Sequence, residues 1–462
     1  MKVKFMSGVD TIFEPSSVIL IGSSKIREKL GLSSPLLFKN VIHNMRRFFK
    51  GEVYIRDIDK GEGQGFKDLP TVPELAVIML PPEKSIAEVE KCAKMGIKAF
   101  IMITGGYEDY QRQELLRLKE KYGVRILGPN TVMGVINTAN GLNTTFERDL
   151  MPKRGSIAVV SQSGGVGACL LDWACHYKIG ISKFAFTGDK IDVDDIDLLQ
   201  YFAKDEETRV ICLYMEGIKN GRRLIEEARK IVVKKPIVAL KGGITQEAAH
   251  RAKSHTASMA GSDEIFDAAF KKAGIIRVED PEELLNAAIA LSKQPPMFGD
   301  NIAIVSNVGG PAILAADAVA RNNLKLARLS DETKKKIERL YPSIDATNPI
   351  DIIADARAER YRKVLDLVLA DKNVDGVLVI NMLKSCFFEP EDAKVIPEVA
   401  AKHPKKPVVD VAAGGEDFKL VYRVIGESSI PVYNLPEKGV RVLKVLRTYG
   451  KILERLGKAQ KK

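Results

Sequence analysis

One histidine stands in a segment of small and basic residues, RAKSHTASMAGS at positions 251–262. His255 has Arg251 and Lys253 close by, and no cysteine stands near it, so the segment does not suggest a metal cage. Small neighbours leave a side chain room to move and let a reacting group approach it. The segment therefore fits a histidine that reacts, although an idle histidine in a surface loop fits the same pattern.

Two other features fall on the same expected sheet edge. The stretch VVSQSGG turns from a strand pattern into a helix pattern, which places the N–H groups of Ser163, Gly164 and Gly165 at a helix N-terminus, where unpaired donors attract phosphate. The strand RVICLYME ends at Glu216, and the strand KPIVALKG leads through an irregular loop to His255. Ligands bind beyond the carboxyl ends of the strands of an open parallel sheet, so the three features converge.

A histidine, a carboxylate and an anion-binding turn together suit phosphoryl transfer to nitrogen. Attack on phosphorus needs a neutral imidazole with one nitrogen free, and a carboxylate that accepts the other ring N–H fixes the tautomer. The helix N-terminus would hold the phosphoryl oxygens. Each feature alone is also typical of ordinary structure, so the combination is a hypothesis.

The same residues permit a serine hydrolase. The sequence SQSGG at 161–165 is one residue away from the G-x-S-x-G nucleophile elbow, and an acid and then a histidine follow in the order of α/β-hydrolases. Ser163 would then be the acylated nucleophile. Ser161 in place of the first glycine and the lack of an upstream HGGG-like loop disfavour this alternative. Labelling of Ser163 by a fluorophosphonate probe would favour it.

Short β-branched runs alternate with helical patterns along the 462 residues, which is typical of parallel sheets with helical crossovers. We expect an α/β protein of three doubly wound domains: a Rossmann-like domain over 1–150, a flavodoxin-like domain over 151–294, and a second flavodoxin-like domain over 295–462. The segment SKQPPMFGD at 292–300 is typical of a linker. In the first domain we expect strands at 17–22, 52–58, 74–80, 98–104 and 124–128, and helices near 33–48, 84–95 and 108–122.

The second and third domains begin alike. SIAVVSQSGGVGACLLDWA and NIAIVSNVGGPAILAADAV share a strand, a serine (Ser161 and Ser306), a Gly-Gly pair and an apolar helix. The match favours duplication of one fold over convergence on a common strand–turn–helix pattern.

Composition narrows the function classes. The net charge of +11 fits an anionic ligand, but no basic stretch is interleaved with aromatic residues, so we expect no nucleic-acid partner. We expect no membrane association, because no apolar run approaches the roughly 20 residues of a span, and no secretory signal is visible. The five scattered cysteines include no CxxC pair, which predicts buried thiols in a cytoplasmic protein.

The first domain opens on VILIGSSKIREKLG, where only Gly22 and Gly31 are available for a dinucleotide fingerprint that needs three glycines. A strand–Gly–turn still admits a phosphate, and Lys25 and Arg27 add positive charge. The pattern indicates a nucleotide-like ligand other than a nicotinamide cofactor, or a purely structural turn.

The motifs KSHTASMAG, VSQSGGVG, LYMEG, VIMLPPEKS, ITGGYED and LGPNT, each at its place in the chain, resemble the NDP-forming acyl-CoA synthetase superfamily. The resemblance is strongest to the α subunits of archaeal-type ADP-forming acetyl-CoA synthetases and extends over essentially the whole chain. Succinyl-CoA synthetase α subunits are similar through the first two domains but lack the third.

The resemblance implies the reaction acyl-CoA + ADP + phosphate ⇌ carboxylic acid + CoA + ATP. Phosphate would attack the thioester to give an acyl phosphate, His255 would take the phosphoryl group, and Glu216 would steady the phosphohistidine. The turn at Ser163, Gly164 and Gly165 would cradle it before transfer to Mg²⁺-bound ADP. CoA would bind the first domain at Gly22, Ser23, Ser24, Lys25, Lys60, Ile103, Thr104 and Gly105.

The resemblance also implies a partner chain. No part of the sequence resembles an ATP-grasp domain, so ADP or ATP and Mg²⁺ would bind a separate β subunit in an α2β2 heterotetramer, with no metal site in this chain. The third domain would pack in that assembly, and NPID at 348–351 is a candidate structural turn. Asp189 stands where relatives usually show Gly-Asn, and Ala168 stands where succinyl-CoA synthetases carry a tyrosine near the acyl site. The resemblance therefore implies small acids such as acetate only at the level of the family. A non-catalytic CoA-binding regulatory protein is the remaining alternative.

Overall fold

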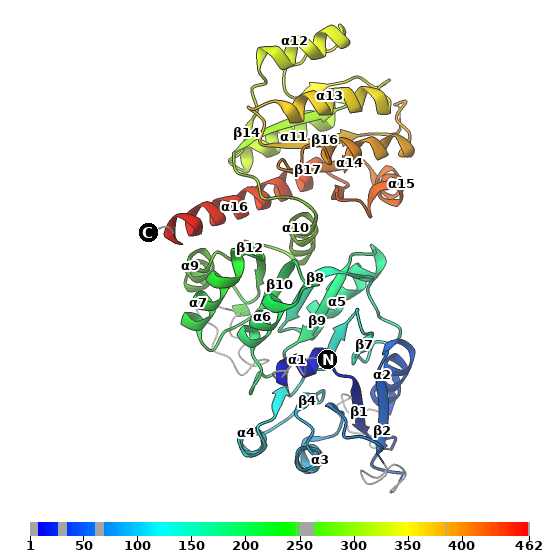
Figure 1. The fold of residues 1–462 in the computed structure, drawn as a ribbon, viewed down its shortest axis with the longest axis vertical. Helices are drawn as coiled ribbons and strands as arrows, with labels where there is room; N and C mark the ends of the chain where they lie inside the picture. Colours follow the sequence, from blue (N-terminus) through cyan, green and yellow to red (C-terminus); the bar gives the residue numbers. More distant parts are fainter. Residues whose placement is uncertain are drawn as a thin grey trace. The chain divides into compact units, whose positions relative to one another are not determined.

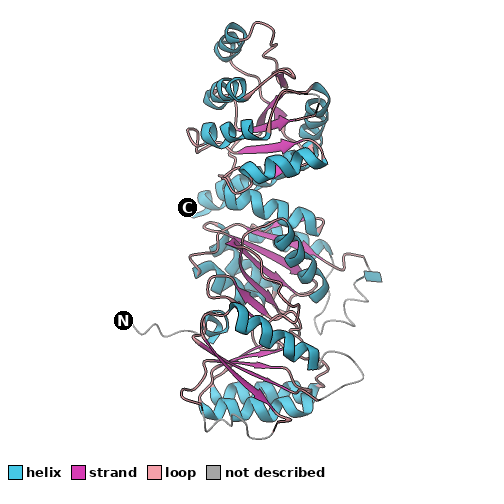
Figure 2. Ribbon diagram, turned by 90° about the vertical axis from the view of Figure 1, so that its right-hand side faces the viewer, coloured by secondary structure: helices cyan, strands magenta, loops and turns pink. Residues whose placement is uncertain are grey.

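The computed structural model describes residues 8–25, 35–60, 69–245, 247–248, 263–384 and 386–460. Figures 1 and 2 show three mostly parallel sheets with helices on their faces. The chain divides into two compact units, Met1–Leu284 with two sheets and Leu285–Lys462 with one. His255 and its segment lie outside the described residues.

The first sheet has the parallel order β2-β1-β3-β4-β5. Its strands are β1 (Ser17–Gly22), β2 (Glu52–Asp57), β3 (Leu75–Ile78), β4 (Ala99–Met102) and β5 (Arg125–Leu127), with helices α1 (Gly8–Phe13), α2 (Pro35–Phe48), α3 (Pro82–Met95) and α4 (Asp109–Tyr122). All residues of β1, β3 and β4 are buried, as in a sheet covered on both faces. The expected strands, helices and doubly wound Rossmann-like class are confirmed.

The second sheet has the order β12-β11-β10-β8-β9-β6-β7. Its parallel part, read from the first strand β8, follows the flavodoxin-like order 2-1-3-4-5. The strands are β8 (Arg154–Ser161), β9 (Ile181–Phe186), β10 (Val210–Met215), β11 (Ile237–Lys241) and β12 (Ile276–Val278), with helices α5 (Gly164–His176), α6 (Asp195–Lys204), α7 (Gly221–Val232), α9 (Asp263–Ala273) and α10 (Pro281–Lys293).

Two short strands that the sequence did not predict complete the second sheet. Strands β6 (Val135–Asn137) and β7 (Leu142–Asn143) pair antiparallel with each other, and β6 pairs antiparallel with β9. These two strands therefore belong to the second sheet although they precede position 150. The domain boundaries themselves stay a prediction.

The third sheet has the order β14-β13-β16-β17-β18, with β15 paired to β13. Read from β13 it again follows 2-1-3-4-5. Its strands are β13 (Asn301–Ser306), β14 (Lys325–Leu326), β15 (Ile350–Asp351), β16 (Gly376–Asn381), β17 (Val408–Ala412) and β18 (Val432–Tyr433). Its helices are α11 (Gly309–Arg321), α12 (Asp331–Leu340), α13 (Ala358–Ala370), η2 (Pro390–Lys394), α14 (Val395–Ala400), α15 (Gly415–Ile425) and α16 (Pro436–Gln460).

The two matching serines make the same turn. Ser161 Oγ donates to Ser163 O at 2.7 Å and accepts from Ser163 N at 3.2 Å. Ser306 Oγ donates to Val308 O at 2.7 Å and accepts from Val308 N at 3.2 Å. Identical geometry in two flavodoxin-like sheets is what a duplicated fold predicts.

The cysteines differ from expectation. Cys92 and Cys212 are buried, Cys175 and Cys386 are partly exposed, and Cys169 is exposed, so the prediction of five buried thiols is wrong. Leu170 and Leu171 take the buried face of α5, which turns the preceding Cys169 outward. Within the described ranges, no helix combines the length and apolarity that crossing a bilayer requires.

Candidate functional site

The start of helix α5 forms an open turn at the carboxyl edge of the second sheet. Ser163 is its N-cap, and its side chain accepts from Val166 N at 3.4 Å. Among the described residues, a Cβ added to Gly165 would meet no atom within 4 Å, and one at Gly164 would first meet Val132 at 3.3 Å. Open space beside the first helical N–H groups fits the anion-binding turn expected from the sequence.

The same serine does not have the backbone of a nucleophile elbow. Ser163 has φ −116° and ψ 126°, which is ordinary extended backbone. The elbow instead holds its serine on a sharp, strained turn. The geometry of Ser163 therefore favours a capping residue over an acylated nucleophile.

Glu216 directly follows strand β10 and is half-buried. Its side-chain Oε1 accepts from Tyr214 Oη at 3.2 Å. Burial raises the pKa of Tyr214, so its hydroxyl stays protonated and donates at neutral pH. A Cβ on Gly242 would lie 2.3 Å from Tyr214 Oη, so a glycine is needed there for the ring to keep this position.

Gln162 joins the α5 turn to Glu216. Its Oε1 accepts from Glu216 N at 2.7 Å and from Gly217 N at 3.0 Å. Its Nε2 donates to Gly217 O and to Asp195 Oδ2, both at 2.9 Å. The buried carboxamide thus bridges β8 and β10, where the order of the strands reverses and ligands usually bind.

The third sheet has a shorter version of this bridge. Asn307 Nδ2 donates to Met382 O at 2.9 Å, and Met382 N donates to Asn307 Oδ1 at 3.0 Å. Neither Gln162 nor Asn307 was predicted as a functional residue from the sequence. The available signal was a carboxamide that follows the matched serine in each copy.

A buried ion pair anchors the loop after β9 at the same point. Lys190 Nζ lies 2.9 Å from Asp195 Oδ2 and donates to Gly217 O at 3.3 Å. Asp195 Oδ2 also accepts from Gln162, so one carboxylate oxygen holds two donors. The ends of β8, β9 and β10 are therefore fixed relative to one another.

The same loop also hydrogen-bonds to residues that follow β5 of the first sheet, where the sequence predicts CoA. Asp189 N donates to Pro129 O at 2.9 Å, and Asn130 Nδ2 donates to Asp189 Oδ1 at 3.3 Å. Asn130 N in turn donates to Thr104 O at 2.8 Å. Arg112 pairs with Asp189 at 3.3 Å and balances the charge of its carboxylate. The edge of the first sheet at Thr104 is thus continuous with the edge of the second sheet at Gln162, through the loop after β9.

Ile103 and Thr104 are buried, and Gly105 is half-buried. A Cβ on Gly105 would lie 2.7 Å from Asn130 Oδ1, so the glycine permits this close packing. Gly22 is similarly required by a neighbour, because its Cβ would lie 2.4 Å from the ring of Phe38. Close packing against Asn130 and Phe38 therefore accounts for both glycines without a ligand.

The first βα turn has its amide donors already engaged. Ser24 N donates to Asp57 Oδ1 at 3.1 Å, and Lys25 N donates to Asp59 Oδ2 at 3.0 Å. Asp59 also accepts from Ser23 Oγ, and this bond is the largest cause of the lowered pKa of Asp59. The side chains of Lys25 and Lys60, unlike these amides, are exposed and accessible to an anionic ligand.

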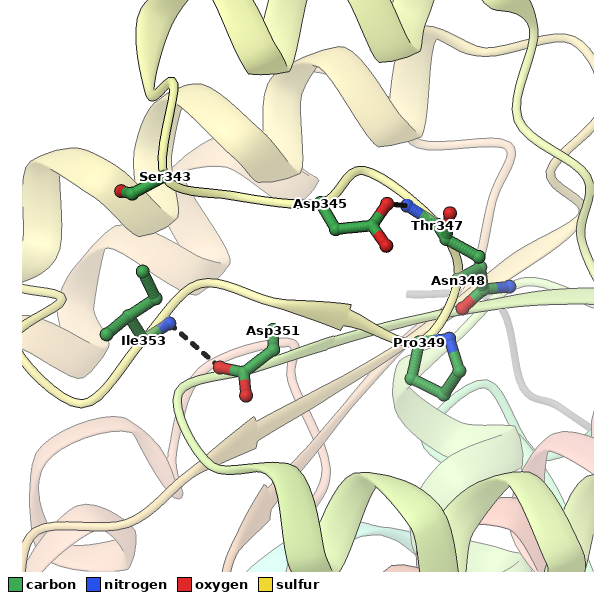
Figure 3. A pocket seen from close by; sticks show the side chains of 7 residues that line it. All are labelled: Ser343, Asp345, Thr347, Asn348, Pro349, Asp351 and Ile353. Carbon is green, nitrogen blue, oxygen red and sulfur yellow. Dashed lines mark hydrogen bonds between the residues drawn. The ribbon is translucent and has the colours of Figure 1, made fainter.

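A pocket of about 380 Å³ lies in the unit of the third sheet (Figure 3). It is lined by Ser343, Asp345, Thr347, Asn348, Pro349, Asp351 and Ile353. Asn348 Oδ1 accepts from Ile304 N at 2.9 Å, and Asn348 Nδ2 donates to Ile302 O at 2.8 Å. The NPID segment therefore closes onto β13, as a structural turn does. Over the described part of the chain, no three His, Cys, Asp or Glu side chains gather as metal ligands.

Comparisons with known families cover nearly the whole chain. Residues 41–137 match a CoA binding domain, residues 154–291 match a succinyl-CoA ligase like flavodoxin domain, and residues 302–456 match a ligase-CoA domain. These matches follow the three sheets in order.

Individual relatives agree. The α subunit of acetate–CoA ligase (ADP-forming) II from Pyrococcus furiosus is 36% identical over 93% of this chain and 95% of its own length. Acetate–CoA ligase (ADP-forming) from Methanocaldococcus jannaschii is 38% identical over 94% of this chain and 62% of its own length.

A solved structure of the dinucleotide-forming acetyl-coenzyme A synthetase 1 of Ca. Korarchaeum cryptofilum, in complex with phosphate and ADP, superposes with a TM-score of 0.87. Its sequence identity is 30%, and the match covers 98% of this chain and 99% of that one. The chain belongs to the family of ADP-forming acetate–CoA ligases, and within it to the α-subunit type.

Proposed function

We propose that this chain catalyses, with a partner, acyl-CoA + ADP + phosphate ⇌ carboxylic acid + CoA + ATP through a phosphohistidine on His255. One observation carries the proposal. The α5 turn and Glu216 are fixed by Gln162 on an edge that is continuous, through Asp189 and Asn130, with the expected CoA-binding edge. Thioester cleavage and phosphoryl capture can therefore share one site.

In the first step, a phosphate oxygen attacks the thioester carbonyl carbon, the C–S bond breaks, and CoA leaves as the thiolate. In the second, an imidazole nitrogen of His255 attacks phosphorus and the carboxylate of the acid leaves. Glu216 balances the positive charge that develops on the ring, and the amide groups at Ser163, Gly164 and Gly165 hold the phosphoryl oxygens. The phosphoryl group then passes to ADP, which restores the imidazole.

CoA supplies the thiol that the reaction releases. Lys25 and Lys60 would bind its phosphates, with Gly22, Ser23, Ser24, Ile103, Thr104 and Gly105 along the same edge. Lys60 is well suited because its side chain is 73% exposed and lies 3.9 Å from Asp57, which leaves it able to turn toward a ligand.

The partner is a β subunit with an ATP-grasp domain, in an α2β2 assembly, and it would hold Mg²⁺ and the nucleotide. Support comes from the α-subunit names of the relatives, and from the M. jannaschii enzyme, whose single chain extends beyond the match. The proposal places the enzyme in the cytoplasm, where its substrates are found.

Mixing the chain with its partner is expected to give ATP from acetyl-CoA, Mg²⁺-ADP and phosphate, whereas neither chain alone should turn over. Coupled ATP detection measures the rate, and acetate release should match ATP mole for mole. Release of acetate without ATP, together with fluorophosphonate labelling of Ser163, would contradict the proposal and favour the hydrolase.

Replacing Gln162 by leucine is expected to lower turnover by about 10- to 100-fold, because the N–H groups of Glu216 and Gly217 lose their acceptor and the carboxylate loses its fixed position. Steady-state assays of the assembled enzyme measure kcat, and thermal melting measures stability. The phosphohistidine step should slow while the KM for acetyl-CoA changes little.

Asn307→Leu is the matched control, since it removes the equivalent bridge from the third sheet. Both variants should lose about 1–3 kcal/mol of stability, the usual cost of leaving a buried group unpaired. Only Gln162→Leu should slow turnover strongly. Equal losses of turnover would reduce Gln162 to a purely structural residue.

A further inference from the structure

Lys241 ends strand β11 at the same edge and is a buried cation. Three described lysines are less than a tenth exposed. Lys183 lies 2.8 Å from Asp205, and Lys190 lies 2.9 Å from Asp195. For Lys241, the described residues offer no carboxylate oxygen within 4 Å, which separates it from the other two.

Within the described part of the chain, the contacts of Lys241 are with neutral groups. Its Nζ donates to the carbonyl oxygen of Gly242 and, at 3.5 Å, to that of Gly243. It also lies 4.7 Å from the ring centre of Phe266. Carbonyl oxygens and an aromatic face satisfy an ammonium's geometry, but they leave a full positive charge uncompensated in a buried place.

The acids nearest in sequence do not pair with Lys241: Glu247 is exposed and makes no described ion pair with it. Asp263 begins helix α9, but Arg277 binds its two carboxylate oxygens at 2.8 and 3.0 Å. Residues 249–262 contain neither aspartate nor glutamate. Burial lowers the pKa of Lys241, and the more distant charges of Asp263 and Glu216 oppose that shift. An anionic ligand would balance the ammonium and favour its charged form.

The strand register places Lys241 beside the proposed phosphate site. Lys241 pairs with Met215, the residue before Glu216, and Tyr214 pairs with Ser161 on the other side. Neighbouring strands lie about 4.8 Å apart, so roughly 10 Å separates the end of β11 from the end of β8. A lysine side chain and a phosphate together can fill that distance.

We propose that Lys241 is a further phosphate-binding residue, whose ammonium neutralises a phosphate dianion held between it and the start of α5. The inference rests on the proposed function, because it takes the dianion to be the phosphate that the reaction consumes. Free phosphate and the transferred phosphoryl group present the same oxygens, and no covalent bond forms to Lys241. The ammonium exchanges the carbonyl oxygens of Gly242 and Gly243 for those of the ligand.

Lys241→Met and Lys241→Arg in the assembled enzyme test this. The methionine variant should raise the KM for phosphate about tenfold or more, since a charge-assisted contact is lost, while the KM for acetyl-CoA stays within about twofold. The arginine variant should keep the phosphate KM within about threefold of wild type. A wild-type phosphate KM with faster decay of the phosphorylated protein would instead assign Lys241 to the transferred group.

Lys235→Met is the matched control. Lys235 precedes the same strand and also donates to two backbone carbonyls, at Phe202 (2.9 Å) and Asp205, but it lies at the opposite edge. Its loss should cost stability and leave the phosphate KM unchanged. If Lys241→Met keeps both a wild-type phosphate KM and wild-type decay, or if Lys235→Met raises the phosphate KM equally, the inference is overturned.

Failure of the proposed function gives a different result. In that case the wild-type assembly makes no ATP from phosphate, and titration with inorganic phosphate replaces the kinetic assay. Weaker phosphate binding by Lys241→Met than by wild type would still support the residue's assignment. Equal binding would overturn it.

Discussion

Substituting alanine for His255 is expected to abolish both ATP synthesis and labelling of the protein. With its partner, Mg²⁺ and radiolabelled ATP, the wild-type chain should gain a label that is stable in base and labile in acid, the signature of a phosphorus–nitrogen bond. Removing the imidazole removes the covalent route, so turnover should fall by about three orders of magnitude or more.

His250→Ala is the control, since it removes a second histidine from the same stretch of sequence. It should label as wild type does. Two histidines that the structure describes have carboxylate partners far from this segment in sequence: His43 bonds Asp149 at 2.8 Å, and His403 bonds Asp366 at 2.9 Å. A label that persists in His255→Ala would contradict the assignment of the carrier.

Much of the fold could be predicted because buried parallel strands are continuous apolar runs. Strand β1 (Ser17–Gly22) is such a run, and the structure keeps its predicted bounds. Strands β6 and β7 could not be found in this way. They are three and two residues long, too short to show a period, and β6 exists through pairing of Val135 with Ala185, far along the chain.

The site was predictable only where chemistry coincides with the end of a strand. Glu216 directly follows an apolar run, and Ser163 comes two residues after the end of β8, so their edge could be deduced from the sequence. Gln162 and Lys241 resemble ordinary strand ends in the sequence. Gln162 is distinguished by a contact between strands, and Lys241 by having no carboxylate within 4 Å among the residues that the structure describes. Such features arise from tertiary structure: Gln162 meets Gly217, a residue 55 positions later.

Replacing Glu216 by glutamine is expected to slow phosphoryl transfer by about 100-fold without unfolding the protein. In the proposed mechanism the carboxylate balances the charge that develops on the imidazole as the N–P bond forms, and a neutral amide cannot do so. The backbone bond from Glu216 N to Gln162 does not involve the side chain, so the strand end should keep its position. Rapid-quench labelling gives the rate of phosphorylation, and the label's decay gives the lifetime.

Tyr214→Phe separates charge from packing. It removes the 3.2 Å hydrogen bond to Glu216 but keeps the carboxylate and the ring against Gly242, so only a few-fold slowing is expected. Labelling of Glu216→Gln at the wild-type rate would remove Glu216 from the mechanism. If Tyr214→Phe were as slow as Glu216→Gln, the hydrogen bond that orients the carboxylate would matter as much as its charge, and the assignment of Glu216 as an electrostatic partner of the imidazole would fail.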